Sequence, residues 1–533
     1  MIRNRDDSVI WGLFLWKNTP VIVIIYFRLF YGKEGVLMGM NKLNSLLWEY
    51  IPFENFIIYG VKIVHENMDE VLWDEVDELK AFRDEDYNIS ISCVRHINRL
   101  KTTKANKGNS DKKVVAGESL NVGKISINIS SDYIVEFSPC YCNGYESKID
   151  KTNYLISCYR IEGKSITKNP KMIKEWIING NPRGLRFCDN QKFEYIVEGA
   201  VSGKYGDKEF PAKELVPEFE YQGRFMHVKY KDTAFDIHYL GDNYGPAWST
   251  NLSISYREDY GRIPSEEERK IIRDYLSFFV GKRLIFIGES SYDENGNAIG
   301  FVMETPRNYG MDLKKTCLNA AKPPFSQEYR NLKQYFINFE KYIDAFAELY
   351  NKLDFETLFT LYWYAKEIAK PMDLPILSSA LENLKRKWYE EVELNPETVL
   401  MDKKDFAKRI KPIKELVQTQ FDGTEYTERM KRSVESMNRM SVSEQLTHFF
   451  KAIDMVIGNI EKNALKARNF SAHGSLGGSN IDYQEQCMIS QVYECIIVRV
   501  VLKLLKYDGN YVDYGTLGFP EKNINHPSGS ENV

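Results

Sequence analysis

The patterning of this chain changes from strand-like to helix-like at Pro323-Pro324, and this change constrains the fold more than any other feature. Before it, alternating or β-branched runs predict strands, among them residues 124–129, 193–197, 251–256 and 282–287. Asn295-Gly296, between two such runs, predicts a hairpin. Beyond it, apolar residues recur every three or four positions. We therefore expect an α+β protein, with a β-rich N-terminal domain followed by an all-α helical bundle.

The expected helices have clear apolar faces. One helix lies inside the β-rich region, where a capping box at Ser265–Glu268 precedes an apolar face that ends at Gly281. The bundle is expected to use faces within residues 336–346, 358–365, 377–384 and 449–456, and a last helix over residues 483–506. Short connections between such helices are typical of a bundle.

The length of 533 residues is too great for one hydrophobic core. We expect an apolar N-terminal extension over residues 1–40, a β-rich sensor or regulatory domain over 41–320, the helical bundle over 325–508 and a flexible tail over 509–533. The tail is rich in Gly, Asn, Pro and Ser, which favour disorder at a terminus.

The apolar runs at residues 9–16 and 21–31 are each too short for a membrane-spanning helix, and Asp6 and Asp7 do not suit a signal peptide. We expect translation to begin at Met38 or Met40. The alternatives are a buried strand or helix and a peripheral membrane anchor. We expect no stable membrane insertion and a cytoplasmic protein.

Charge and cysteine content restrict the classes of partner. The net charge of −4 gives no overall attraction to nucleic acid, so any RNA contact must come from local basic patches. The lysine-rich segment 101–113 is expected to be a solvated loop, with RNA contact as the alternative. The cysteines do not have the spacing of zinc ligands, and no Walker-type phosphate loop is present, so neither a metal nor another cofactor is expected.

The segment Arg468-Asn469-Phe470-Ser471-Ala472-His473-Gly474 brings a permanent cation close in sequence to an imidazole. Such a pair can cleave RNA without a metal. The arginine stabilises charge on the phosphate, and the histidine transfers a proton to or from the attacking 2′-hydroxyl or the leaving oxygen. On one continuous helix, residues five apart point about 140° away from each other. The helix is therefore distorted near Gly474, or two copies of the chain pool their residues.

These residues resemble the active-site motif of the HEPN superfamily, helical bundles whose ribonuclease members carry an arginine, a polar residue and a histidine at this separation. Arg468, Asn469 and His473 match the motif. Residues 377–384 look like the helix that often contributes a glutamate, here Glu382. The layout is similar to that of the ApeA-type subgroup, in which a large β-rich region precedes a C-terminal HEPN bundle.

The resemblance implies a metal-independent endoribonuclease of anti-phage defence, acting by abortive infection, usually as a dimer. His473 would be the general acid or base, Arg468 would stabilise the phosphorane, Asn469 would orient the arginine or bind phosphate, and Glu382 would hold the arginine or histidine in place. The β-rich region would sense a trigger such as a phage component, or restrain the bundle.

Other interpretations stay open. Arg468, Asn469 and His473 could simply end a helix, where cations are favourable. Glu382 could form an exposed helix pair with Arg386, four residues later. The whole bundle could be a non-catalytic RNA- or protein-binding module. A membrane-attached sensor is a third function, and it depends on residues 9–31 alone.

Overall fold

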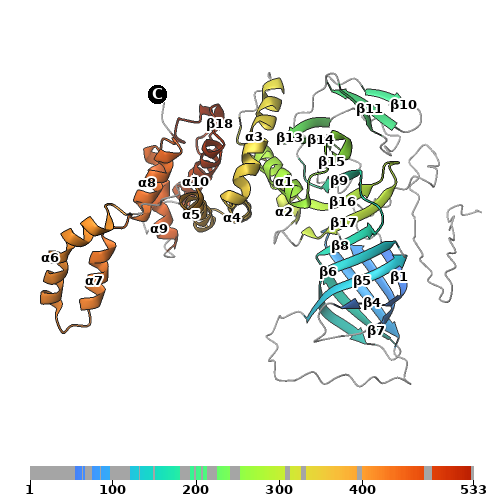
Figure 1. Cartoon of the computed structure of the whole chain (residues 1–533), viewed down its shortest axis with the longest axis horizontal. Coiled ribbons are helices and arrows are strands. Elements are labelled where there is room, and N and C mark those ends of the chain that lie inside the picture. Colours follow the sequence, from blue (N-terminus) through green and yellow to red (C-terminus); the bar gives the residue numbers. More distant parts are fainter. Residues whose placement is uncertain are drawn as a thin grey trace, which may run out of the picture. The chain divides into compact units, whose positions relative to one another are not determined.

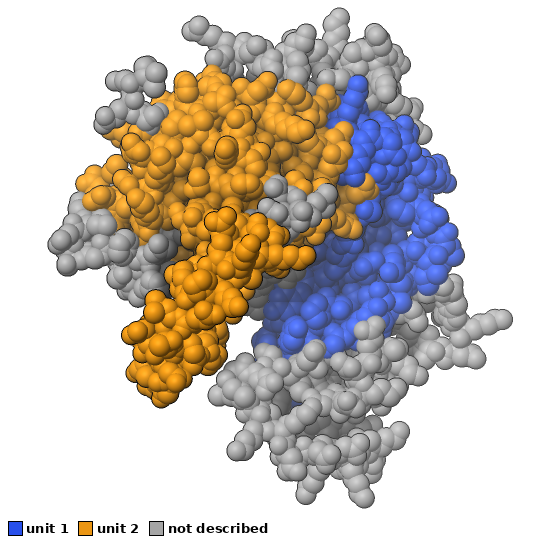
Figure 2. Space-filling view, turned by 60° about the vertical axis from the view of Figure 1, so that its left-hand side comes forward, with its two compact units in different colours: residues 1–266, 284–320 blue, residues 267–283, 321–533 orange. Residues whose placement is uncertain are grey.

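The computed structural model describes residues 55–62, 64–65, 75–84, 86–96, 120–130, 132–147, 151–180, 193–196, 200–205, 208–212, 225–239, 252–306, 313–325, 332–392, 399–472 and 483–529. The chain forms two compact units (Figure 2). Unit 1 comprises Met1–Glu266 and Leu284–Ala320, and unit 2 comprises Glu267–Arg283 and Ala321–Val533. The expected α+β class is confirmed, with a β-rich N-terminal region followed by helices. The expected extension over residues 1–40 and the lysine-rich segment 101–113 lie outside the described residues.

Most strands of unit 1 belong to one antiparallel sheet (Figure 1). Its main path runs in the order β1-β3-β4-β7-β6-β8-β17-β16-β9-β15-β14-β13, with β5 on β6 and β2 on β5. The bounds are β1 Asn55–Lys62, β2 Val64–His65, β3 Glu75–Arg83, β4 Ile89–His96, β5 Leu120–Ser130, β6 Tyr133–Ser147, β7 Lys151–Cys158, β8 Arg160–Ser165, β9 Met172–Ile177, β13 Phe225–Tyr230, β14 Thr233–Tyr239, β15 Leu252–Arg257, β16 Phe286–Tyr292 and β17 Ala298–Glu304. Strands β10 Phe193–Ile196, β11 Ala200–Tyr205 and β12 Lys208–Ala212 form a separate sheet, and α2 spans Leu313–Leu318.

Strand β4 shows why this sheet has an apolar core on one face. Ile89, Ile91 and Cys93 are buried, whereas Ser90 and Ser92 between them are only half-buried. Ile91 lies opposite Ile156 of β7, which is also buried. Because side chains alternate between faces, this register places the apolar set on one side of the sheet.

The hairpin expected at Asn295-Gly296 is confirmed, since it joins β16 to β17. Gly296 has a φ of 77° and donates its N–H to the carbonyl of Asp293 at 3.1 Å. The carboxylate of Asp293 accepts the N–H of Asn295 at 3.0 Å. The glycine supplies the positive φ that the turn requires. The strand expected over residues 282–287 begins only at Phe286.

Unit 2 is helical. Its helices are α1 Glu266–Val280, α3 Leu332–Lys352, α4 Phe355–Glu367, α5 Leu374–Glu391, α6 Lys403–Phe421, α7 Thr427–Ser436, α8 Val442–Ala452, α9 Asn459–Ala472 and α10 Tyr483–Leu504. The helices expected from the faces at 336–346, 358–365 and 377–384 and over 483–506 are α3, α4, α5 and α10. None of the helices within the described ranges combines the length and the apolar character needed to cross a membrane.

Helix α1 packs in unit 2, although the strands on either side of it in sequence belong to unit 1. The ring of Tyr275 on α1 lies 5.0 Å from that of Phe339 on α3, and its hydroxyl donates to the Phe339 carbonyl at 2.8 Å. Phe279 adds an edge-to-face contact with Phe339 at 4.7 Å. A single domain boundary at residue 320 therefore leaves α1 in the β-rich region, although the aromatic face of α1 is buried against another helix.

The segment after Gly509 is ordered as far as residue 529, so the expectation of a flexible tail is wrong for these residues. Strands β18 Asn510–Val512 and β19 Glu521–Asn523 pair with each other. Tyr511 and Ile524 are fully buried, and Val512 donates its N–H to the Pro324 carbonyl at 3.1 Å. A few apolar side chains and specific hydrogen bonds thus order a segment of polar composition.

The apolar face expected to continue over residues 449–456 is interrupted. Helix α8 ends at Ala452, and Asp454 adopts a φ of 55°, in the left-handed region. Helix α9 begins only at Asn459. The break separates α8 from the helix that carries the candidate motif. Helices α6 and α7 were not expected from the sequence, and they form an antiparallel pair.

Candidate functional site

Helix α9 carries the first part of the expected motif. It spans Asn459–Ala472, so the backbones of Arg468 and Asn469 are helical. Their side chains lie outside the described residues, and so does the whole of His473. The position of the Arg468 side chain relative to His473 therefore stays a prediction from the sequence.

Glu382, the fourth expected site residue, lies on α5, and α5 contacts α9. The carboxylate of Glu382 forms an ion pair with the ammonium group of Lys385 at 2.6 Å. Lys385 is buried, whereas Glu382 is half-buried. A buried lysine paired to a carboxylate holds that carboxylate in place, because separating the pair would leave a charge without compensation.

The alternative interpretation was an exposed pair between Glu382 and Arg386. The main contacts of Arg386 are with other residues. Its guanidinium donates to Glu390 at 2.8 Å and to Asn383 at 2.6 Å. Lys385 is thus the partner that sequence spacing did not identify. It lies within the apolar face of α5, beside Leu381, Leu384 and Trp388.

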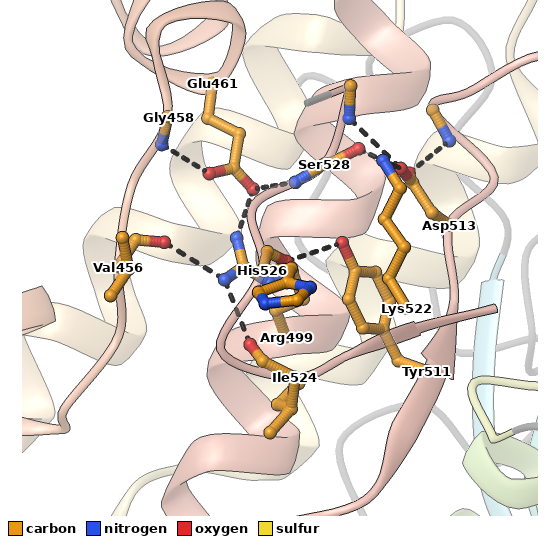
Figure 3. Close-up of polar contacts among 12 residues, drawn as sticks. Val456, Gly458, Glu461, Arg499, Tyr511, Asp513, Lys522, Ile524, His526 and Ser528 are labelled. Carbon is orange, nitrogen blue, oxygen red and sulfur yellow. Dashed lines mark hydrogen bonds and ion pairs between the residues drawn. The ribbon is translucent and has the colours of Figure 1, made fainter. Parts of the chain in front are cut away.

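The N-terminal end of α9 is fixed by a buried ion pair between Glu461 and Arg499 of α10 (Figure 3). Glu461 also accepts the N–H of Gly458 and the N–H of Ser528, both at 3.0 Å. Arg499 donates to the carbonyls of Val456 and Ile524 at 3.0 and 3.1 Å. Each charge thus has several partners, as burial of a charge requires.

The C-terminal segment supplies half of these partners, and Asp513 holds it in place (Figure 3). The Asp513 carboxylate pairs with Lys522 at 2.7 Å and accepts the hydroxyl of Thr516 at 2.6 Å, the hydroxyl of Ser528 and the N–H of Gly529 at 3.0 Å. Burial would raise the pKa of Asp513, but these donors lower it below its usual value. The segment closes over the first turn of α9.

A second charged cluster joins α10 to the connection between α4 and α5. Glu494 of α10 pairs with Lys370 at 2.6 Å and with Lys322 at 3.3 Å. Lys370 also pairs with Asp373 at 3.0 Å. Burial would raise the pKa of Glu494, but Lys366, Lys370 and Lys322 together lower it to about 2. Glu494 is therefore ionised throughout the neutral range.

Lys366 is the unusual member of this cluster. Its ammonium group lies over the rings of Tyr362 and Trp363, at 4.9 and 5.4 Å. Burial lowers its pKa to about 8, and the neighbouring Lys322 and Lys370 act in the same direction against the attraction of Glu494. The cluster thus links α10 by charge to the connection between α4 and α5 and to Lys322.

In the part of the chain that the structure describes, no three His, Cys, Asp or Glu side chains come together as metal ligands do. His448 packs among aromatic side chains: its Nδ1 lies 2.8 Å from the Tyr389 hydroxyl, and its ring contacts that of Trp388.

Sequence reasoning missed Arg499, Glu461 and Asp513. One signal could have indicated Arg499, because it stands alone in the apolar run from Cys495 to Leu502. A charge inside such a run is buried and needs a partner. The partner, Glu461, lies too far away in sequence to be identified by spacing.

Comparison of the chain with protein families, with curated proteins and with solved structures found no match.

Proposed function

We propose that this chain is a metal-independent endoribonuclease of the HEPN type that acts in anti-phage defence by abortive infection. The observation that carries the proposal is the sequence Arg468-Asn469-Phe470-Ser471-Ala472-His473, which begins near the end of a bundle helix. Support comes from the contact between α9 and α5, because these helices carry Arg468 and Glu382. Anchoring of α9 by Glu461 and Arg499 favours a rigid support for such a site.

In the proposed reaction, the RNA 2′-hydroxyl attacks the adjacent phosphorus. The new bond joins O2′ to phosphorus, and the bond from phosphorus to O5′ breaks. One basic imidazole removes the 2′-hydroxyl proton, and one protonated imidazole delivers a proton to the leaving O5′. Arg468 compensates the charge on the phosphorane, Asn469 orients the arginine or the phosphate, and Glu382 positions His473 or Arg468. The products are a 2′,3′-cyclic phosphate and a free 5′-hydroxyl.

The proposal includes a homodimer in the cytoplasm. Residues five apart on one helix diverge by about 140°, so two copies would supply the groups that one phosphate needs. The β-rich unit would bind a phage-derived trigger or restrain the bundle until infection.

The test is to sequence the RNA ends that the purified full chain produces with EDTA present. Cyclic-phosphate ends are expected with the natural chain, and cleavage should fall by about 100-fold or more in His473→Ala and Arg468→Ala. Lys466→Ala is the matched control, because Lys466 is an exposed cation on the same helix. Equal cleavage by both alanine variants and the natural chain would reject the proposal. RNA binding without any cleavage would instead support a non-catalytic binding module.

A further inference from the structure

The hairpin of α6 and α7 is closed by its own contacts (Figure 1). At its base, the Asn438 side chain bonds to both the N–H and the carbonyl of Met401, at 3.0 and 2.9 Å. At its tip, Gly423 turns the chain with a φ of 75°, and Thr427 donates its hydroxyl to the Thr424 carbonyl at 3.0 Å. The buried residues of the two helices are Ile410, Thr427 and Val434, which face the partner helix.

Five large apolar side chains of this hairpin remain exposed. They are Ile413 (44%), Leu416 (59%), Tyr426 (51%), Met430 (38%) and Met437 (58%). At about 100° per residue, all five are turned to the same rotational side of the buried positions Ile410 and Val434. When two antiparallel helices pack against each other, residues that are rotated in the same sense from the contact line lie on the same face of the pair. The five side chains therefore form one surface, the apolar hairpin face.

The ion pair between Lys414 and Glu435, at 2.5 Å, lies on the other face of the hairpin. Both residues are turned in the opposite rotational sense from Ile410 and Val434. The hairpin thus has one charged face and one apolar face. Five half-exposed large side chains amount to several hundred Å² of contiguous apolar surface, which is typical of an interaction site.

Charges are distributed unevenly along the hairpin. The tip, residues 415–428, has four carboxylates and no basic side chain. The rest of the hairpin, toward its base, is basic: residues 403–414 have six basic side chains against Asp405, and residues 429–439 have four against Glu435. Two hairpins packed antiparallel about a twofold axis place each acidic tip against a basic base. A parallel arrangement would place like charges together.

We propose that the apolar hairpin face binds the same face of a second copy of this chain, so that two hairpins form an antiparallel four-helix bundle. A helical hairpin with one apolar face is half of such a bundle. The acidic tip and the apolar side chains disfavour RNA as the occupant, although the base is cationic. This inference does not depend on ribonuclease activity, but it would supply the dimer that the proposed function requires.

The test measures the mass of the full chain in solution by analytical ultracentrifugation. All variants are made in the His473→Ala background, so that production does not depend on whether the chain cuts RNA. Leu416→Glu and Met430→Glu are expected to raise the dimer dissociation constant by about 30-fold or more. Gln418→Glu is the matched control, because it adds the same charge to a half-buried position of α6 on the opposite side from this face. Circular dichroism checks that each variant keeps its helices.

Charge reversal tests the antiparallel arrangement. Arg409 lies toward the base beside the apolar face, and Glu425 lies at the tip. Arg409→Glu and Glu425→Arg should each weaken the dimer, and the double variant should regain most of the affinity. A natural chain that is monomeric at tens of micromolar, or a Leu416→Glu variant that dimerises as well as Gln418→Glu, would overturn the proposal. The proposal would also be overturned if Arg409→Glu kept the mass of the dimer but no longer bound RNA. The hairpin would then be an RNA-binding surface.

Discussion

Arg499 on α10 and Glu461 at the start of α9 form an ion pair in which both side chains are fully buried, with 0% exposure. The pair connects the last long helix to the helix that carries Arg468, and the C-terminal segment encloses it by contributing the Ile524 carbonyl and the Ser528 N–H. The position of α9 thus depends on residues from three distant parts of the sequence.

Arg499→Met is expected to lower the free energy of unfolding of the helical unit by about 3–5 kcal/mol, because Glu461 would keep a buried charge without its cation. Replacement of both residues by Met should cost less than the sum of the single changes. Urea denaturation followed by helical circular dichroism measures this. Glu390→Gln is the control, because it breaks an exposed pair with Arg386 and should leave the midpoint unchanged. A loss below about 1 kcal/mol for Arg499→Met would contradict the importance of the buried pair.

Asp513→Ala is expected to release the C-terminal segment, because it removes the acceptor for Lys522, Thr516 and Ser528. The expected loss of stability is about 3 kcal/mol, and the new sites of limited proteolysis should fall within residues 510–529. Asp508→Ala serves for comparison, because the Asp508 side chain is 86% exposed. If the segment resists protease equally in both variants, Asp513 does not hold it.

The low pKa of Glu494 predicts an acid-dependent loss of stability. Its folded-state pKa of about 2 lies below the ordinary value of 4.5, so the stabilisation is complete above pH 4.5 and is lost as the pH falls toward 2. The difference corresponds to about 3 kcal/mol. Thermal unfolding of the natural chain and of Glu494→Gln across this range measures it. The two stability curves should converge at low pH, and parallel curves would exclude Glu494 as the cause.

Lys366 predicts a second pH-dependent change of stability, in alkaline solution. Its folded-state pKa of about 8 lies below the ordinary value of 10.5, so the unfolded chain binds its proton more tightly between these values. Stability should therefore increase with pH from about 8 to 10.5, as far as this residue determines it. Lys366→Met should remove this component from the pH profile of the unfolding midpoint. An identical profile in the variant would show that the desolvated amine of Lys366 has no such effect.

Glu382→Gln tests the role of this carboxylate in the proposed cleavage. If Glu382 stabilises the protonated form of His473, the variant should lower the imidazole pKa and move the pH–rate profile to lower pH. The maximal rate is expected to fall about tenfold with KM unchanged. Glu390→Gln, on the exposed side of the same helix, should behave like the natural chain. A uniform decrease in rate without a shift of the profile would assign Glu382 a structural role only.

Local patterns predicted much of the secondary structure. The apolar face at 377–384 appears in α5, and the hairpin at Asn295-Gly296 joins β16 to β17. Both signals depend on residues a few positions apart, which is the range over which periodicity and turn preference act. The break at Asp454 was not predicted, because a polar residue with a positive φ leaves little trace in the apolar pattern.

By itself, the sequence determined the order of the strand-rich and helical regions, the spans of most helices and the residues of the candidate motif, because these follow from local periodicity and residue identity. Only the tertiary structure decided that α1 joins the helical unit, that residues 510–529 are ordered, and that Glu461 has a buried charged partner in Arg499. Burial and charge pairing depend on which distant segments come into contact. Residue spacing along the chain does not identify those contacts.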